Sequence, residues 1–177
     1  MRISLFVGLA CVLFVPTVYA QNINFPNRQA IVLNEPEPMV VLSGFSFENV
    51  YERSTFRLRT ELSWRNASDR PITAFEVVVL EYDPFNRPIN RGGRWLITGK
   101  NSGNWLPLAP GEQSSDGLIG LSDEPVLTAI AFVRAIRFED GTIWSADIES
   151  IERQIRGRLP VLTDLGELTP EPDSGEE

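Results

Sequence analysis

The sequence predicts an all-β protein whose strands form an antiparallel β-sandwich with one short C-terminal helix. Three observations predict this fold class. Residues 55–66 alternate apolar and polar side chains, residues 72–82 form a β-branched apolar run, and turn residues separate several further short apolar segments. Many short strands separated by turns are typical of sandwiches, in which two sheets share one core.

Residues 1–20 match a secretory signal peptide. Arg2 supplies a positive charge, residues 3–15 are apolar, and a small residue, Ala20, ends the segment. The apolar run is shorter than the roughly 20 residues that span a bilayer. We therefore expect cleavage after Ala20 and a periplasmic or secreted protein. An uncleaved anchor and a lipoprotein acylated at Cys11 are the alternatives, and we expect membrane association only if the segment is retained.

The chain lacks the residues on which most enzyme chemistry depends. It contains no histidine, its one cysteine is Cys11, and its net charge is −8. Without imidazole or thiolate it cannot form a Ser-His-Asp or Cys-His nucleophile system or a zinc or copper site of the usual kind. The acidic balance argues against nucleic-acid binding. We expect a protein without cofactor or metal that is not an enzyme.

A single β-sandwich domain is expected at residues 39–160, after an extended lead-in or edge strand at 21–38. The alternation at 55–66 predicts a half-buried strand, because successive side chains of a strand point to opposite faces. The apolar run at 72–82 predicts a central strand that is covered on both faces. The expected strands are 39–47, 55–66, 72–82, 94–98, 104–108, 114–121 and 127–138.

The dipeptide Asp140-Gly141 predicts the clearest turn of the chain. It lies between the apolar segments 135–138 and 142–144. A two-residue hairpin turn of the primed type needs positive φ at its central residues, and Asp-Gly supplies this readily. We therefore expect a hairpin that turns at this dipeptide.

A helix is expected near residues 146–157, with Ser145 as a candidate N-cap. Its narrow apolar stripe favours packing against the sheet, and binding of a partner protein is the alternative. Residues 161–177 carry many acidic side chains, no basic side chain and two prolines, so we expect an acidic disordered tail. The stripe consists of Ile148, Ile151, Ile155 and Leu159.

Three segments carry a family resemblance: Trp64-Arg65-Asn66-Ala67-Ser68, Val79-Leu80-Glu81-Tyr82-Asp83 and Leu108-Ala109-Pro110-Gly111-Glu112. Together they resemble bacterial immunoglobulin-like domains of the FxLYD type. In that family an asparagine-containing turn leads to a strand that closes on an aromatic-Asp pair, and a Leu-x-Pro-Gly-Glu turn follows. Val79 and Glu81 replace the motif's phenylalanine and leucine. The resemblance implies an immunoglobulin-like sandwich, an extracytoplasmic accessory role and no catalytic residues.

The candidate binding residues are two tryptophans and the arginines that precede them. Trp95 and Trp105 flank a segment rich in glycine and asparagine. The other two tryptophans, Trp64 and Trp144, fall on apolar faces and are expected in the core. Sugar-binding sites often expose aromatic side chains. The segment predicts a binding edge for an anionic or carbohydrate ligand or an acidic protein surface, unless its tryptophans pack across strands. Its residues are Arg87, Arg91, Arg94, Trp95 and Trp105.

The leading functional hypothesis is a non-catalytic exported module for protein-protein interaction in the bacterial envelope, through an edge strand, the helix or the Arg-Trp segment. A carbohydrate- or small-ligand-binding module that uses Trp95 and Trp105 is the alternative. A hydrolase that works with carboxylates alone is a third hypothesis, because glycoside hydrolysis needs only two of them. Its candidate acids are Glu81, Asp83, Glu139 and Asp140. The sequence does not identify the envelope protein or the glycan.

Overall fold

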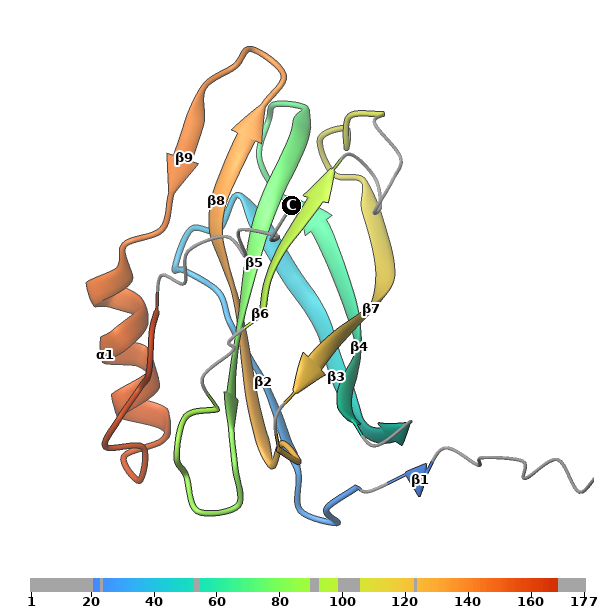
Figure 1. Ribbon diagram of the computed structural model, residues 1–177. Coiled ribbons are helices and arrows are strands. Elements are labelled where there is room, and N and C mark those ends of the chain that lie inside the picture. Colours follow the sequence, from blue (N-terminus) through green and yellow to red (C-terminus); the bar gives the residue numbers. More distant parts are fainter. Residues whose placement is uncertain are drawn as a thin grey trace, which may run out of the picture.

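In the computed structural model the protein is a sandwich of two β-sheets with one helix at its side (Figure 1). The structure describes residues 21–22, 24–52, 55–89, 93–98, 106–122 and 124–168. The predicted all-β sandwich is confirmed. The expected signal peptide lies outside the described residues, and the immunoglobulin-like assignment stays a prediction.

Four antiparallel strands form the first sheet, sheet A: β1 (Gln21–Asn22), β3 (Val40–Glu52), β4 (Thr55–Asn66) and β7 (Gln113–Ser122). They lie in the order β1-β3-β4-β7. β3 and β4 form a long hairpin whose register shifts at a bulge between Leu42 and Gly44. β7 returns from the other sheet to pair with β4.

Five strands form the second sheet, sheet B: β2 (Gln29–Leu33), β5 (Ile72–Tyr82), β6 (Gly93–Thr98), β8 (Thr128–Phe138) and β9 (Ile143–Ser145). The order is β2-β8-β5-β6. β2 pairs in parallel with one part of β8, and β9 pairs with another part of the same strand. The segment 21–38 thus supplies an edge strand of the sandwich.

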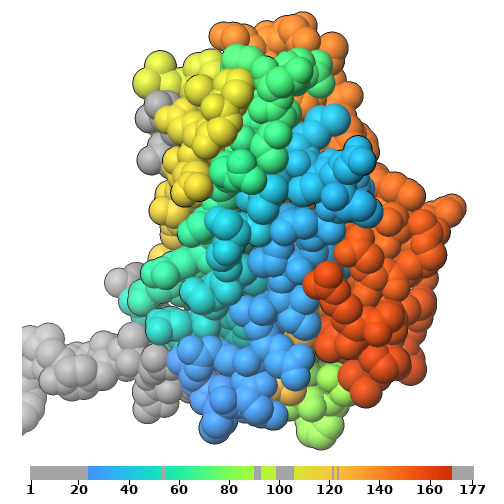
Figure 2. Space-filling model, turned by 180° about the vertical axis from the view of Figure 1, so that it is seen from behind, coloured from blue at the N-terminus to red at the C-terminus, as the bar shows by residue number. Residues whose placement is uncertain are grey.

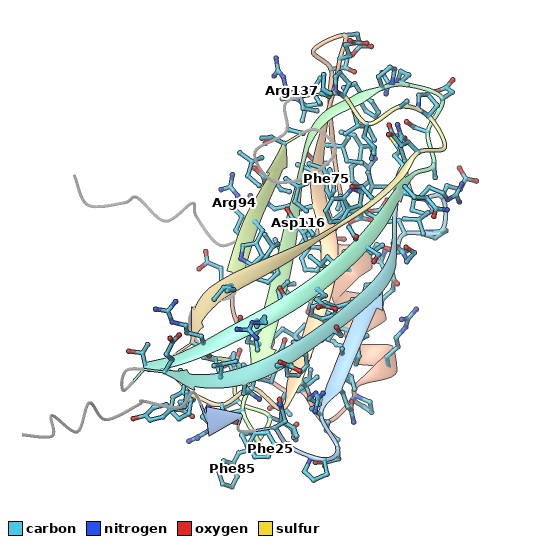
Figure 3. All side chains as sticks on the ribbon, turned by 90° about the vertical axis from the view of Figure 1, so that its right-hand side faces the viewer. Phe25, Phe75, Phe85, Arg94, Asp116 and Arg137 are labelled. Atoms are coloured by element: carbon cyan, nitrogen blue, oxygen red, sulfur yellow. The ribbon has the colours of Figure 1, made fainter. Side chains whose placement is uncertain are left out.

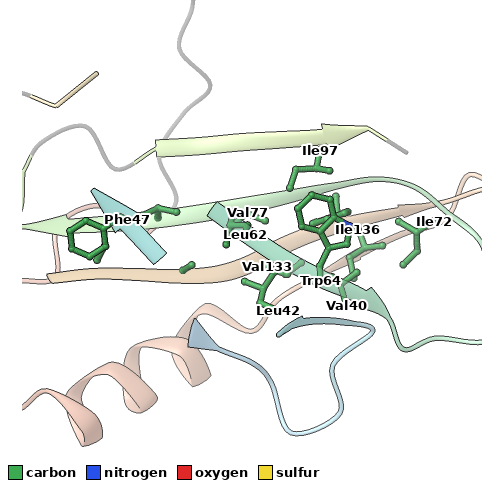
Figure 4. Close-up of a cluster of buried hydrophobic side chains, with 14 of the residues drawn as sticks. Val40, Leu42, Phe47, Leu62, Trp64, Ile72, Val77, Ile97, Val133 and Ile136 are labelled. Carbon is green, nitrogen blue, oxygen red and sulfur yellow. The ribbon is translucent and has the colours of Figure 1, made fainter. Parts of the chain in front are cut away.

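β4 buries its apolar side chains between the sheets, as its alternation predicts. Leu62 and Trp64 are buried in the core, whereas Arg59 and Arg65 on the other face are exposed. Figure 4 shows the two core residues among apolar side chains from both sheets. The ring of Trp64 meets Phe75 of β5 edge-on, with 5.4 Å between ring centroids, an arrangement that aromatic pairs favour.

β5 is covered on both faces, which confirms the expectation from its continuous apolar run. Val77 and Val79 belong to the core between the sheets. Val78 and Leu80 belong to a second apolar cluster on the outer face of sheet B. A strand buried on both faces cannot alternate apolar and polar residues, which explains the sequence of this segment.

The strand expected at 104–108 is not formed by the part of it that the structure describes. Within residues 106–108, Leu108 forms an isolated β-bridge with Ile72, and no strand is assigned. Two backbone hydrogen bonds of 2.8 and 3.0 Å join this pair. The prolines that flank Leu108 lack an N–H donor, so a longer ladder is unfavourable here.

The hairpin between β8 and β9 forms, but its predicted two-residue turn is wrong. The Phe138 N–H donates to Thr142 O at 3.0 Å, which leaves three residues in the loop. Gly141 has a φ of 85°, whereas Asp140 is not among the residues with positive φ. Three-residue hairpin loops need a left-handed residue only at their last position, and glycine meets this need.

The helix α1 (Ile148–Arg158) lies beside sheet B, and its apolar stripe packs against the sheet as expected. Asp147 is its N-cap, in place of the expected Ser145, and accepts a hydrogen bond from the Ser150 N–H. Ile151 and Ile155 are buried against the outer face of β5 and β8. Within the described residues, no helix is long and apolar enough to cross a membrane.

The expectation of a disordered tail at 161–177 is wrong for residues 161–168. Leu162 and Leu165 are buried in the cluster beneath α1, and the Tyr82 hydroxyl donates to Leu165 O at 3.1 Å. Seen from behind, α1 and this segment form one flank of the molecule beside the N-terminal strands (Figure 2). Three leucines, including Leu168, give the segment apolar surface despite its acidic composition.

Candidate binding edge

The structure does not gather the three described residues of the expected Arg-Trp site, Arg87, Arg94 and Trp95, into one surface. Arg91 and Trp105 lie outside the described residues. Arg87 lies in the loop after β5, whereas Arg94 and Trp95 are neighbours on β6. Because successive side chains of a strand point to opposite faces, Arg94 lies on the outside of sheet B and Trp95 faces sheet A.

Arg87 fixes the loop that leads from β5 towards β6. Its guanidinium bonds Asp83 through Nε at 2.6 Å and through Nη2 at 2.5 Å. The other Asp83 oxygen accepts the N–H groups of Phe85 and Arg87 at 2.8 and 2.9 Å. Burial alone would raise the Asp83 pKa, but these hydrogen bonds and the Arg87 charge outweigh it and lower the pKa. Arg87 therefore has a structural role.

Trp95 closes the gap between the two sheets at their β6–β7 side. A Cβ atom on Gly93 would approach its indole to 3.1 Å, and one on Gly120 of β7 would lie 3.9 Å away. The side chain is half-buried and packs against the core. Trp95 is therefore a packing residue that glycines on both sheets accommodate, and the expected exposed aromatic platform is not formed by this residue.

The edge of sheet A at β3 is covered by side chains and by a short strand. Asn34 bonds the backbone of Leu42 twice, with its Nδ2 donating to Leu42 O and its Oδ1 accepting from Leu42 N, both at 3.0 Å. Farther along the strand, Asn24 Oδ1 accepts the Asn49 N–H at 3.0 Å. β1 pairs with the following residues. These groups occupy positions that another strand would otherwise use.

The edge of sheet B at β8 is covered in a similar way. β2 pairs with one part of this edge and β9 with the other. The outer side of β2 meets α1, where Arg158 Nη1 donates to Val32 O at 3.1 Å. The sequence near these asparagine and arginine residues carries no signal for this role, so it was not predicted.

On the opposite side of the sandwich, β6 and β7 are the last strands of their sheets. Among the described residues, no strand pairs with the outer edge of either one. We call the outer edge of β7 the open edge. β7 pairs with β4 through ten consecutive positions without a register shift. It contains one charged residue, Asp116, and no proline or lysine, and Ile119 on its outer face is 59% exposed.

A regular strand of this length at the end of a sheet presents a row of backbone groups to which another strand can bond. Proteins usually protect such edges with lysine, proline, bulges or covering segments. The open edge has none of the first three, because β7 contains no lysine or proline and its register with β4 has no bulge. It is the best candidate binding feature among the described residues.

The candidate carboxylates do not form one catalytic site. Glu81 and Asp83 lie at one end of sheet B, and Glu139 and Asp140 lie beyond the other end of β8. An eleven-residue strand such as β5 spans about 35 Å, far more than the roughly 5 to 9 Å between paired catalytic carboxylates. Hydrogen bonds to Thr142 lower the Asp140 pKa, as those described above lower that of Asp83.

Two further features bear on ligand binding within the described residues. No group of three or more histidine, cysteine, aspartate or glutamate side chains is placed to hold a metal ion. A hollow beside Trp144 and the start of α1, lined also by Met39 and Ile151, has a volume of about 10 Å³. That is room for one water molecule and too little for a sugar.

No protein-family model matches the chain, and no curated protein matches it. Among solved structures, it is similar to a hypothetical protein from Peptoclostridium difficile 630. The two chains are 14% identical, the match covers 70% of this chain and 92% of the other, and the TM-score is 0.44.

Proposed function

We propose that this protein is a non-catalytic, exported module that binds an extended segment of an envelope protein as an added strand on β7. The observation that carries the proposal is the contrast between the open edge and the covered edges of the same sandwich. In strand addition, backbone hydrogen bonds supply affinity, and alternate side chains supply specificity.

The chemistry of β7 indicates the kind of segment that fits. Ser114, Ser115 and Gly117 have small side chains, whereas Ile119 offers an exposed apolar contact. In the register between β4 and β7, Arg59 lies opposite Ile119 and Arg57 lies opposite Leu121. A partner strand with an apolar residue opposite Ile119 and acidic residues within reach of these arginines would complement this surface.

The immunoglobulin-like assignment remains part of the proposal and is supported by the strand order. When β3 to β9 are lettered A to G, sheet A contains A, B and E, and sheet B contains C, F and G. The immunoglobulin constant fold has the same partition, with strand D on the first sheet. Here the corresponding strand, β6, pairs with β5 instead.

The segments that resemble FxLYD-type domains also support this assignment, because two of them meet at one corner. Asn66 Nδ2 donates to Leu108 O at 3.0 Å and to Arg70 O at 2.7 Å. The Gly111 N–H donates to Asn66 O at 2.8 Å. The asparagine of the first segment thus holds the proline-glycine turn of the third in place.

The test compares Ile119→Lys with Ile143→Lys in chains that begin at Gln21. Both residues are exposed isoleucines, at 59% and 67%, but Ile143 lies on β9 at the covered side. A lysine beside the open edge should oppose strand addition. We expect Ile119→Lys to abolish capture of the envelope partner and Ile143→Lys to retain it.

The captured partner, once purified, permits a second measurement on the unmodified chain. Strand addition should slow amide hydrogen exchange in β7 and leave β9 unchanged, because only backbone groups of β7 gain partners. Equal capture by both variants, or protection confined to another element, would overturn the proposal.

A further inference from the structure

The outer face of sheet B divides into an apolar half beneath α1 and a charged half beyond it. Val78 and Phe132 belong to the apolar half. The charged half carries three arginines and one carboxylate, and we call it the arginine face. Figure 3 shows two of its arginines, Arg94 and Arg137, pointing out from the sheet. Its residues are Glu76 on β5, Arg94 on β6, and Arg134 and Arg137 on β8.

The arginine face has more positive than negative charge. Glu76 is shared, because Arg94 Nη2 bonds its Oε1 and Arg134 Nη1 lies 3.8 Å from its Oε2. Among the described residues of this face, Arg137 adds a third positive charge and Glu76 is the one carboxylate. The surplus is unusual in a chain with a net charge of −8, and it attracts anionic groups.

Acidic residues follow the last described part of the chain, which lies on the same side of sheet B as this face. After α1 it runs along the outer side of sheet B, where Leu165 O accepts the Tyr82 hydroxyl and Leu168 packs against the apolar cluster. The nine residues that follow, 169–177, lie outside the described part. They contain four acidic residues and no basic residue: Glu171, Asp173, Glu176 and Glu177.

The segment 169–177 is long enough to reach the arginine face from the last described residue. Tyr82 marks the position of the C-terminal segment on β5, and Glu76 lies six residues back along the same strand, about 20 Å away. Nine residues can span up to about 30 Å when extended. The segment 169–177 is therefore long enough to bring its acidic side chains to the arginine face.

We propose that the arginine face binds the acidic segment 169–177 of its own chain. Single surface ion pairs contribute little, but attachment to the folded body gives the segment a high local concentration near the face. The interaction is independent of partner binding at β7, which lies on the other sheet. It leaves the open edge unobstructed and covers the outside of β6.

The test is a distance measurement between two spin labels in a chain that begins at Gln21. This chain has no cysteine, so labels can be attached at Leu96→Cys and Ser174→Cys alone. Leu96 pairs with Glu76 across β5 and β6 and is 61% exposed, so a label there reports on the arginine face. The control pair is Ile119→Cys with Ser174→Cys, which places the first label on sheet A.

We expect short distances in the first pair and longer distances in the control pair. The short-distance population should fall by more than half in about 1 M salt, where the screening length drops to about 3 Å. It should fall similarly when Glu171, Asp173, Glu176 and Glu177 are replaced by Gln or Asn.

Two results would overturn the proposal. One is a broad distribution in both pairs at low salt, which would mean that the segment has no preferred site. The other is a short-distance population that survives both high salt and the neutral segment, since the contact would then not depend on charge.

Discussion

The two edges of sheet A differ in how their backbone groups are used. At β3, the side chains of Asn34 and Asn24 bond backbone groups, and β1 pairs with the residues that follow. At β7, no strand among the described residues pairs with the outer edge. The contrast shows that this fold can protect an edge with single side chains. The proposed strand addition rests on the edge at which the described residues show no such protection.

The two sides of the sandwich also differ in apolar packing. On the covered side, α1 and the segment after it add a second apolar cluster outside sheet B. On the β6–β7 side, the half-buried Trp95 packs against the core between the sheets, beside Gly93 and Gly120. Trp95 is the largest side chain of β6 and β7, so its loss should be felt strongly on this side.

The largest expected effect on stability is that of Trp95→Ala. Removal of the indole from between Gly93 and Gly120 should lower the free energy of unfolding by about 3 kcal/mol, at the low end for buried tryptophans because this one is half-buried. Urea unfolding followed by circular dichroism measures it. Trp95→Phe should recover part of the loss, and a negligible loss in Trp95→Ala would contradict the packing role.

The next largest effect should come from Asn34→Ala, which opens the covered edge. Leu42 is 2% exposed, so its backbone N–H and C=O would lose their partners without gaining full access to water. We expect a loss of about 2 kcal/mol in the free energy of unfolding. Sedimentation velocity should also show more self-association, because the β3 edge becomes available. A monomer of unchanged stability would mean that Asn34 does not protect the edge.

A smaller effect is expected at the loop before β6, from Asp83→Asn. The change removes a buried charge that accepts hydrogen bonds from Phe85 and Arg87, at a cost of about 1 kcal/mol near pH 7. The folded state lowers the Asp83 pKa, so the stabilisation is present above the ordinary aspartate pKa. It is lost as the pH falls through the lower, folded value.

The pH dependence can be measured by unfolding the wild type and Asp83→Asn between pH 7 and pH 2. The difference between them should be constant down to about pH 4 and shrink below it. A difference that grows as the pH falls would contradict the inferred direction of the Asp83 pKa shift.

The smallest effect on stability is expected for Ile119→Lys and Ile143→Lys. Both side chains are exposed, so each change should alter the free energy of unfolding by less than about 0.5 kcal/mol. The two should differ in self-association at high concentration, which Ile119→Lys alone suppresses because it changes the open edge. Equal behaviour of the two variants would remove the distinction between the edges.

Much of the fold could be predicted because its signals are local. The alternation in β4 and the apolar run of β5 predicted their place in the sheets, and the isoleucine stripe predicted the buried face of α1. The Arg-Trp site stays a prediction, because Arg91 and Trp105 lie outside the described residues. Its described members are not brought together on one face, since proximity in sequence does not tell which face of a strand each residue occupies. Arg94 and Trp95 are adjacent in the chain and lie on opposite faces of β6.

Residue types and short-range periodicity were enough to predict the sandwich class and the central strand and to show that the chain contains no imidazole. Tertiary structure alone decided which edges are covered. Asn34 protects Leu42 and Arg158 bonds Val32 only because distant segments meet, and one asparagine in a loop looks like any other. It also decided that residues 161–168 pack, since their leucines need the cluster that α1 and sheet B build together.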